Sequence, residues 1–150
     1  MKKCYLVGML SLSTLFVSMP AVAQEVIANC GASKGKMVYL TPQPKWEDDG
    51  ITNGSIMFIK MKNGKFDVIV KDAVSTLSYT EDGASIVGLE ESPFKKTFVV
   101  LHSKIVVEVF QLTLKSDKSG TLIWSSLKNG AMNGVITKGA LFTASCSPIR

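Results

Sequence analysis

The stretch of sequence that decides the fold runs from residue 55 to residue 72 and reads SIMFIKMKNGKFDVIVKD. At its centre, Asn63-Gly64 tolerates positive φ at both central positions of a type I′ turn, which predicts a two-residue hairpin loop. The runs on either side are rich in the β-branched and aromatic residues that strands favour. We therefore expect two antiparallel strands, Ser55–Lys62 and Lys65–Asp72, joined by this turn.

The length of the loop sets the register of this hairpin, because a shift of one residue turns every side chain to the opposite face. A two-residue loop places three apolar pairs on the core face: Met61 with Phe66, Ile59 with Val68, and Met57 with Val70. The other face then carries Lys60 beside Asp67. Farther from the turn, Phe58 lies beside Ile69 on that outer face. An apolar pair there needs a cover or a ligand, so both are candidate binding residues.

Further turn signals recur along the chain, at Asn53-Gly54, Asp82-Gly83, Asn129-Gly130 and Asn133-Gly134. The runs between them predict seven more strands: Lys36–Thr41, Val74–Tyr79, Ala84–Leu89, Lys96–Leu101, Lys104–Leu114, Thr121–Leu127 and Val135–Ser145. Beyond the N-terminal region, no stretch keeps a helical period over three turns. The fold class is therefore all-β, a single antiparallel meander of about eight or nine strands that closes into a small barrel or sandwich.

The segment Ile105–Phe110 does not alternate between apolar and polar residues. Such a continuous run is typical of a strand that is covered on both faces. The cover is either another part of the domain or a second copy of the chain, in which case a homo-oligomer forms through this strand. Glu108, the charged residue of the run, is expected to guard an exposed edge against aggregation.

Residues 1–23 have the pattern of a secretory signal peptide. Met1-Lys2-Lys3 is basic, Tyr5–Val17 is uncharged, and Ala21-Val22-Ala23 supplies small residues before a cut. The apolar run is shorter than the roughly 20 residues that span a bilayer, and no second one follows. We expect a mature single β domain over residues 24–150, without a transmembrane segment, in the periplasm or secreted.

The mature domain keeps two cysteines, Cys30 and Cys146, because Cys4 leaves with the signal peptide. Export favours pairing over a reactive thiol, and two thiols allow only one intramolecular pair. We therefore expect one disulfide that ties the start of the domain to its end. In the chain-entropy model, so long a loop stabilises the fold by about 4–5 kcal/mol.

Two short matches to catalytic motifs lack the context that their chemistry needs. Ser33 lies in a G-x-S-x-G match, but the nucleophile elbow requires a strand-to-helix turn, and no helix pattern follows. Ser92 and Lys95 form an S-x-x-K match that leads into a strand rather than a helix. We expect no catalytic residue and no enzyme, and a serine hydrolase that uses Ser33 is the least favoured alternative.

Metal and nucleic-acid binding are also disfavoured. His102 is the single histidine and cannot form a zinc site while both cysteines are paired, so we expect it to be exposed in a turn. The acidic runs lack the spacing of a calcium loop. After cleavage, fifteen of the 17 Lys and Arg remain against twelve acids, and Arg150 is the single arginine. Sequence-specific DNA contacts favour Arg, so we expect no cofactor, no metal and no nucleic acid.

Trp46 and Lys45 are the remaining candidate binding residues. They lie in the polar run Pro42–Gly50, which is rich in turn formers. An aromatic side chain in such a loop either folds over a barrel end as a plug, the interpretation we favour, or anchors a ligand or partner.

Four groups of residues carry a resemblance: Cys30-Gly31-Ala32-Ser33-Lys34-Gly35, Trp46 with Asp49-Gly50-Ile51, Gly64–Ile69 with Asp72-Ala73, and Glu81–Ala84. They resemble a group of small exported bacterial proteins of uncharacterised function. The resemblance implies export, to the periplasm where the envelope has two membranes, and no chemistry. The architecture is also similar to that of the periplasmic inhibitors of c-type lysozyme, but the chain lacks their Ser-Gly-rich loop ending in Tyr.

We expect a non-enzymatic binding or inhibitory module that acts through loops on a rigid β scaffold. Its partner would be an envelope or extracellular protein or polymer. The alternative is a small-ligand carrier barrel, although the Met, Phe and Ile side chains expected inside would fill such a barrel.

Overall fold

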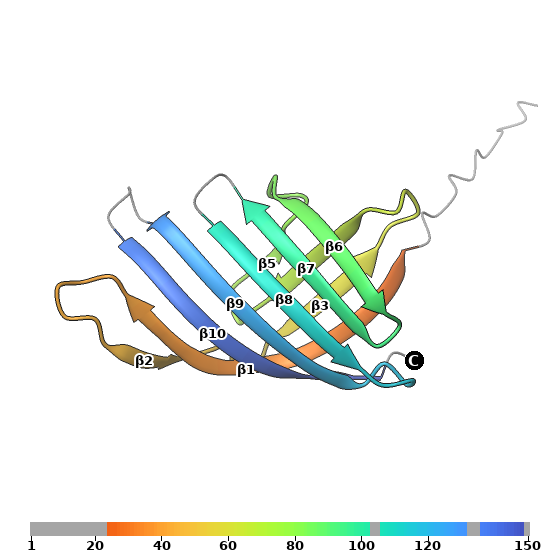
Figure 1. The fold of residues 1–150 in the computed structure, drawn as a ribbon, viewed down its shortest axis with the longest axis horizontal. Coiled ribbons are helices and arrows are strands. Elements are labelled where there is room, and N and C mark those ends of the chain that lie inside the picture. Colours follow the sequence, from red (N-terminus) through yellow and green to blue (C-terminus); the bar gives the residue numbers. More distant parts are fainter. Residues whose placement is uncertain (1–23, 103–105, 132–135, 149–150) are drawn as a thin grey trace, which may run out of the picture.

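The ten strands of the described residues form one antiparallel sheet that curls into a half-barrel, with β6–β10 as one wall and β3–β5 as the other (Figure 1). Nine strands follow the order β5-β4-β3-β1-β10-β9-β8-β7-β6, and β2 pairs with β1. The strands are β1 (Glu25–Tyr39), β2 (Trp46–Asp49), β3 (Ser55–Lys60), β4 (Phe66–Lys71), β5 (Thr76–Ser78), β6 (Ser85–Ser92), β7 (Lys95–His102), β8 (Val106–Leu114), β9 (Gly120–Ala131) and β10 (Ile136–Ser147). The all-β prediction is confirmed.

The computed structural model describes residues 24–102, 106–131 and 136–148. The predicted signal peptide, residues 1–23, lies outside this part of the chain. Within the described ranges, no helix has the length and apolar character needed to cross a membrane.

Strand β1 is longer than the sequence predicts, and Gly35 lies where its backbone closely approaches that of β10. A Cβ at Gly35 would lie 2.0 Å from the carbonyl oxygen of Leu141 on β10. The segment 31–35, which precedes the predicted strand Lys36–Thr41, is part of β1, with a bulge between Cys30 and Ser33. One half of β1 pairs with β3 and the other with β2, which the sequence analysis also took for a loop.

The predicted register of the β3–β4 hairpin is wrong by one residue. Its loop has three residues, since the Met61 carbonyl accepts a hydrogen bond from the N–H of Gly64 at 2.9 Å and the Met61 N–H donates to the Lys65 carbonyl at 2.8 Å. Positive φ is needed only at Gly64, where φ is 76°, which fits a type I turn followed by a bulge rather than a type I′ turn. In this register Phe58 faces Val68.

The shift in register moves the predicted binding pair. Phe58 is fully buried in the core, so it is not a surface binding residue. Ile69 lies opposite Met57 and is partly buried on the outer face. The predicted pair of Lys60 with Asp67 does not form either, because Asp67 accepts a hydrogen bond from the Ser78 hydroxyl at 2.7 Å.

A row of aromatic side chains fills the middle of the half-barrel. Phe142, Trp124, Phe110 and Phe98 are direct cross-strand neighbours on β10, β9, β8 and β7. The row ends at Gly88 on β6, where an added Cβ would lie 2.5 Å from the ring of Phe66 on β4. Glycine thus leaves room for the side chain that closes the gap between the two walls.

The run around Val107 is neither wholly buried nor on an edge. β8 begins at Val106, and Ile105 lies outside the described residues. The strand pairs on both sides, with Glu108 and Phe110 fully buried inside and Val107 42% exposed outside. The prediction that Glu108 guards an exposed edge against aggregation is therefore wrong, because its side chain faces the core.

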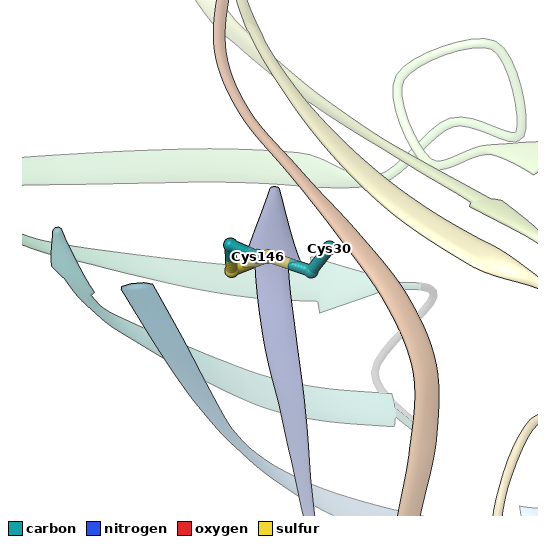
Figure 2. Close-up of a disulfide and its surroundings, with 2 residues drawn as sticks. All are labelled: Cys30 and Cys146. Carbon is teal, nitrogen blue, oxygen red and sulfur yellow. A yellow bond between two sulfur atoms is a disulfide. The ribbon is translucent and has the colours of Figure 1, made fainter. Parts of the chain in front are cut away.

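The predicted disulfide is confirmed. Cys30 on β1 and Cys146 on β10 are direct cross-strand neighbours, joined by a buried bond across 116 residues of sequence (Figure 2). It fastens the two strands that meet in the centre of the sheet.

Candidate functional site

A hollow of about 300 Å³ opens at the end of the half-barrel where β9 ends and β10 begins. One wall comes from β9 and β10, and the other from the segments around β2, β4 and β5. We call it the end pocket, with these principal lining residues: Asp49, Ile51, Val70, Asp72, Leu77, Tyr79, Trp124, Ser126, Lys128, Lys138, Ala140 and Phe142.

The register of β9 and β10 explains the hollow. Three successive inward-facing pairs run toward this end: Phe142 with Trp124, Ala140 with Ser126, and Lys138 with Lys128. The first pair is aromatic and forms the floor. The second pair is small and leaves space above that floor. The third pair places two long side chains at the rim.

Trp124 brings an unpaired donor to the floor. Only 7% of the residue is exposed, and its ring lies between Phe110, centroid to centroid 5.4 Å, and Phe142, 4.6 Å. Over the described ranges, its indole Nε1 is the single fully buried side-chain polar atom without a hydrogen-bond partner. A buried unsatisfied donor costs about 1–3 kcal/mol, so an acceptor that reached it would stabilise the site.

The rim places two positive charges directly opposite each other, an arrangement that destabilises a sheet unless something compensates it. The Lys138 ammonium lies 2.7 Å from a carboxylate oxygen of Asp49 on β2. The Lys128 ammonium lies 3.6 Å from a carboxylate oxygen of Glu108, beyond ordinary hydrogen-bond distance.

Glu108 is a fully buried carboxylate beneath the rim. It accepts hydrogen bonds from the Ser126 hydroxyl at 2.7 Å and from the Tyr79 hydroxyl. Burial, and then the negative charge of Glu108, raise the pKa of Tyr79 above its ordinary value, so Tyr79 stays a neutral donor. These bonds compensate the cost of removing a carboxylate from water.

The opposite wall is partly apolar, with Ile51, Val70 and Leu77. It also carries Asp72, whose carboxylate accepts the N–H groups of Val74 at 2.7 Å and Ser75 at 2.6 Å. These two bonds lower the pKa of Asp72, so it is negatively charged at neutral pH. The end pocket therefore combines an apolar interior with charged groups at its mouth.

A larger hollow, about 510 Å³, lies at the opposite end of the half-barrel. Its charged groups pair with one another: Glu90 with Lys96 at 2.8 Å and with Lys60 at 3.5 Å, and Glu25 with Lys118 at 3.8 Å. Since these charged side chains already pair with one another, the end pocket is the stronger candidate for a ligand-binding site.

Trp46 does not plug the barrel. It begins β2 opposite Val38 and is 58% exposed, and Lys45 beside it is exposed as well. The plug interpretation is therefore wrong, while the anchoring role of Trp46 and Lys45 stays a prediction. The residue of β2 that reaches the end pocket is Asp49.

The motif matches serve local structure. Ser33 is buried in β1, and its hydroxyl accepts the N–H of Ile51 at 3.1 Å. The Ser92 hydroxyl accepts the N–H groups of Phe94 and Lys95 and shapes a turn. His102 is not an exposed turn residue, because it ends β7 with its ring nitrogen 2.9 Å from Asp82.

Over the described ranges, no three His, Cys, Asp or Glu side chains gather in a way that could hold a metal ion. No family model, curated protein or solved structure matches this chain.

The residues of the end pocket are not among those predicted from the sequence. One signal was present, because Lys128 continues the inward alternation of Trp124 and Ser126, and Lys138 that of Ala140 and Phe142. A lysine in line with buried residues near a strand end marks a polar mouth.

Proposed function

We propose that the protein is an exported, non-enzymatic small-ligand-binding protein and that the end pocket is its binding site. The open hollow, lined by Trp124 with its buried and unpaired indole N–H and by two lysines at the rim, carries this proposal. Ligand pockets are typically concave and largely apolar, with a few polar groups that fix orientation. The end pocket has this character, which favours the carrier alternative over a module that acts through its loops.

Export rests on two observations. The N-terminal pattern predicts a signal peptide. The Cys30–Cys146 disulfide supports an oxidising compartment, either the periplasm or the exterior of the cell.

A pair of phenylalanine variants tests the site. Ala140→Phe places a ring in the hollow, whereas Leu141→Phe changes the next residue of β10, which faces outward. Native mass spectrometry of the mature protein, after incubation with periplasmic extract, is expected to show a small molecule on the wild type and on Leu141→Phe, but not on Ala140→Phe. Circular dichroism checks that both variants fold.

Two results would contradict the proposal. One is retention of the molecule by a folded Ala140→Phe variant, which would place the ligand elsewhere. The other is a wild-type protein that takes up nothing from the extract.

The apolar outer face of the sheet favours a second candidate function, which is docking on an apolar protein surface. A second copy of this chain would supply such a surface. Seven large apolar side chains are exposed there: Val87, Leu89, Leu101, Val107, Ile123, Leu127 and Leu141. Leu101, Val107 and Leu127 are direct cross-strand neighbours. Such patches are typical of interaction sites. Sedimentation of the wild type as a dimer and of Val107→Lys as a monomer would support it, and a monomeric wild type would refute self-association.

A further inference from the structure

We infer that the ligand of the end pocket is a small amphipathic monocarboxylate, with its carboxylate between Lys128 and Lys138 and its apolar part inside the hollow. This inference rests on the proposed function and names the ligand class for that same site.

The hydrogen-bond capacity of the β9–β10 wall points to an acceptor. An ammonium group has three donors. Lys138 uses one on Asp49, and Lys128 is too far from Glu108 to form a hydrogen bond. The rim of this wall therefore offers a surplus of donors. A carboxylate has two oxygens that can accept from both ammonium groups at once.

The acidic groups nearby already accept hydrogen bonds within the protein, although over the described ranges one oxygen of Asp72 stays free. Asp49 takes Lys138 and the N–H of Gly50, and one oxygen of Asp72 takes two backbone N–H groups. Glu108 is fully buried under its own donors, so it does not face the hollow. A cationic ligand would bring donors to a wall that already has too many.

The local charges limit the ligand to a single negative charge. Two lysines stand against three carboxylates, those of Asp49, Asp72 and Glu108. A dianion such as a phosphate monoester would add two further negative charges to this balance. Among anionic ligands, a monocarboxylate supplies the acceptors that the wall lacks with the smallest added charge.

The interior of the hollow limits the body of the ligand. Ile51, Val70, Leu77, Ala140 and Phe142 supply its apolar part. Its volume of about 300 Å³ lies at the small end of ligand pockets. Both faces of the Trp124 ring are covered by phenylalanine rings, so the ligand meets the floor at the indole edge rather than by stacking.

Four eight-carbon compounds that differ in their head group test the class by isothermal titration calorimetry on the mature protein: octanoate, octanol, octylammonium and octyl phosphate. We expect octanoate to bind at least tenfold more tightly than each of the others. Lys128→Met and Lys138→Met should each weaken octanoate binding at least tenfold and leave octanol binding unchanged. Lys62→Met is the matched control, because Lys62 is exposed in the β3–β4 loop at the far end of the half-barrel.

The comparison among head groups uses the wild-type protein, so it holds even where a variant does not fold. Suppose that octanol, octylammonium or octyl phosphate binds as tightly as octanoate and that Ala140→Phe abolishes this binding. The monocarboxylate class would then be overturned, while the end pocket would remain the binding site. Failure of octanoate to bind the wild type would overturn the inference, while uptake from periplasmic extract tests the proposed function separately. An equal loss of octanoate affinity in Lys62→Met would also overturn the inference, because the effect of the lysine variants would then reflect the net charge of the protein.

Discussion

Tyr79→Phe removes one hydroxyl from the buried network beneath the end pocket. In the wild type this hydroxyl donates to Glu108, which also accepts from Ser126 and lies near Lys128. Without Tyr79 one carboxylate oxygen loses its donor inside the core. The ring itself still packs on Phe110, since the centroids lie 6.2 Å apart.

The expected loss follows from the kind of bond removed. Hydrogen bonds to charged groups contribute about 1.5–3 kcal/mol, and a buried unsatisfied partner costs a similar amount. We therefore expect Tyr79→Phe to lower the free energy of unfolding by about 2–3 kcal/mol. Urea denaturation measures this change in the free energy of unfolding, and we expect the m-value to be the same in both proteins.

The same variant predicts a difference at high pH. The pKa of Tyr79 is raised in the folded state, so its stabilising contribution is complete below the unfolded pKa of 10.0 and is lost as pH rises above it. The wild type should then lose up to about 1.4 kcal/mol per pH unit more than Tyr79→Phe, since one pKa unit corresponds to that free energy. Lysine titration is common to both proteins and cancels in the comparison.

Tyr39→Phe is the matched control. Tyr39 is partly buried on β1, with the Lys138 ammonium 6.0 Å from its ring, and its hydroxyl has no hydrogen bond within the described ranges. It should change stability by less than about 0.5 kcal/mol, as surface substitutions do. A Tyr79→Phe variant as stable as this control, with the same slope above pH 10, would refute the buried network.

Three further outcomes concern the fold. Replacing Cys30 and Cys146 by Ala should lower the free energy of unfolding by about 5 kcal/mol, since the bond spans 116 residues, and no change on reduction would contradict this. Phe58→Ala should cost about 3–5 kcal/mol in urea denaturation, whereas the predicted register would make it nearly neutral. Gly88→Ala should lower the melting temperature, because its Cβ would lie 2.5 Å from the Phe66 ring, and an unchanged melting temperature would contradict the closure of the walls there.

The sequence predicts the fold class because its signals are local. Turn dipeptides and β-branched runs place most strands, and the even number of cysteines in the mature chain predicts the disulfide. The predicted hairpin register is wrong because Asn63-Gly64 suits two loops that differ in length by one residue. The packing of Phe58 in the core decides between them. The predicted strand begins only at Lys36 because the close approach of Gly35 to β10 appears only once the strands are paired.

The end pocket could not be predicted because it depends on pairing between segments distant in sequence. Lys128 and Lys138 become neighbours through the register of β9 and β10. Asp49 joins them across 89 residues. The unpaired N–H of Trp124 exists only in the packed core.

The most direct test of the end pocket uses the two tryptophans as reporters in one sample. Trp124 lines the hollow, and Trp46 is exposed on β2, so the mature protein labelled with ¹⁵N has one indole signal from each. Titration with octanoate should shift the Trp124 indole signal and leave that of Trp46 in place. A shift confined to Trp46 would contradict the account, because the ligand would then bind at the edge of the sheet and not in the end pocket.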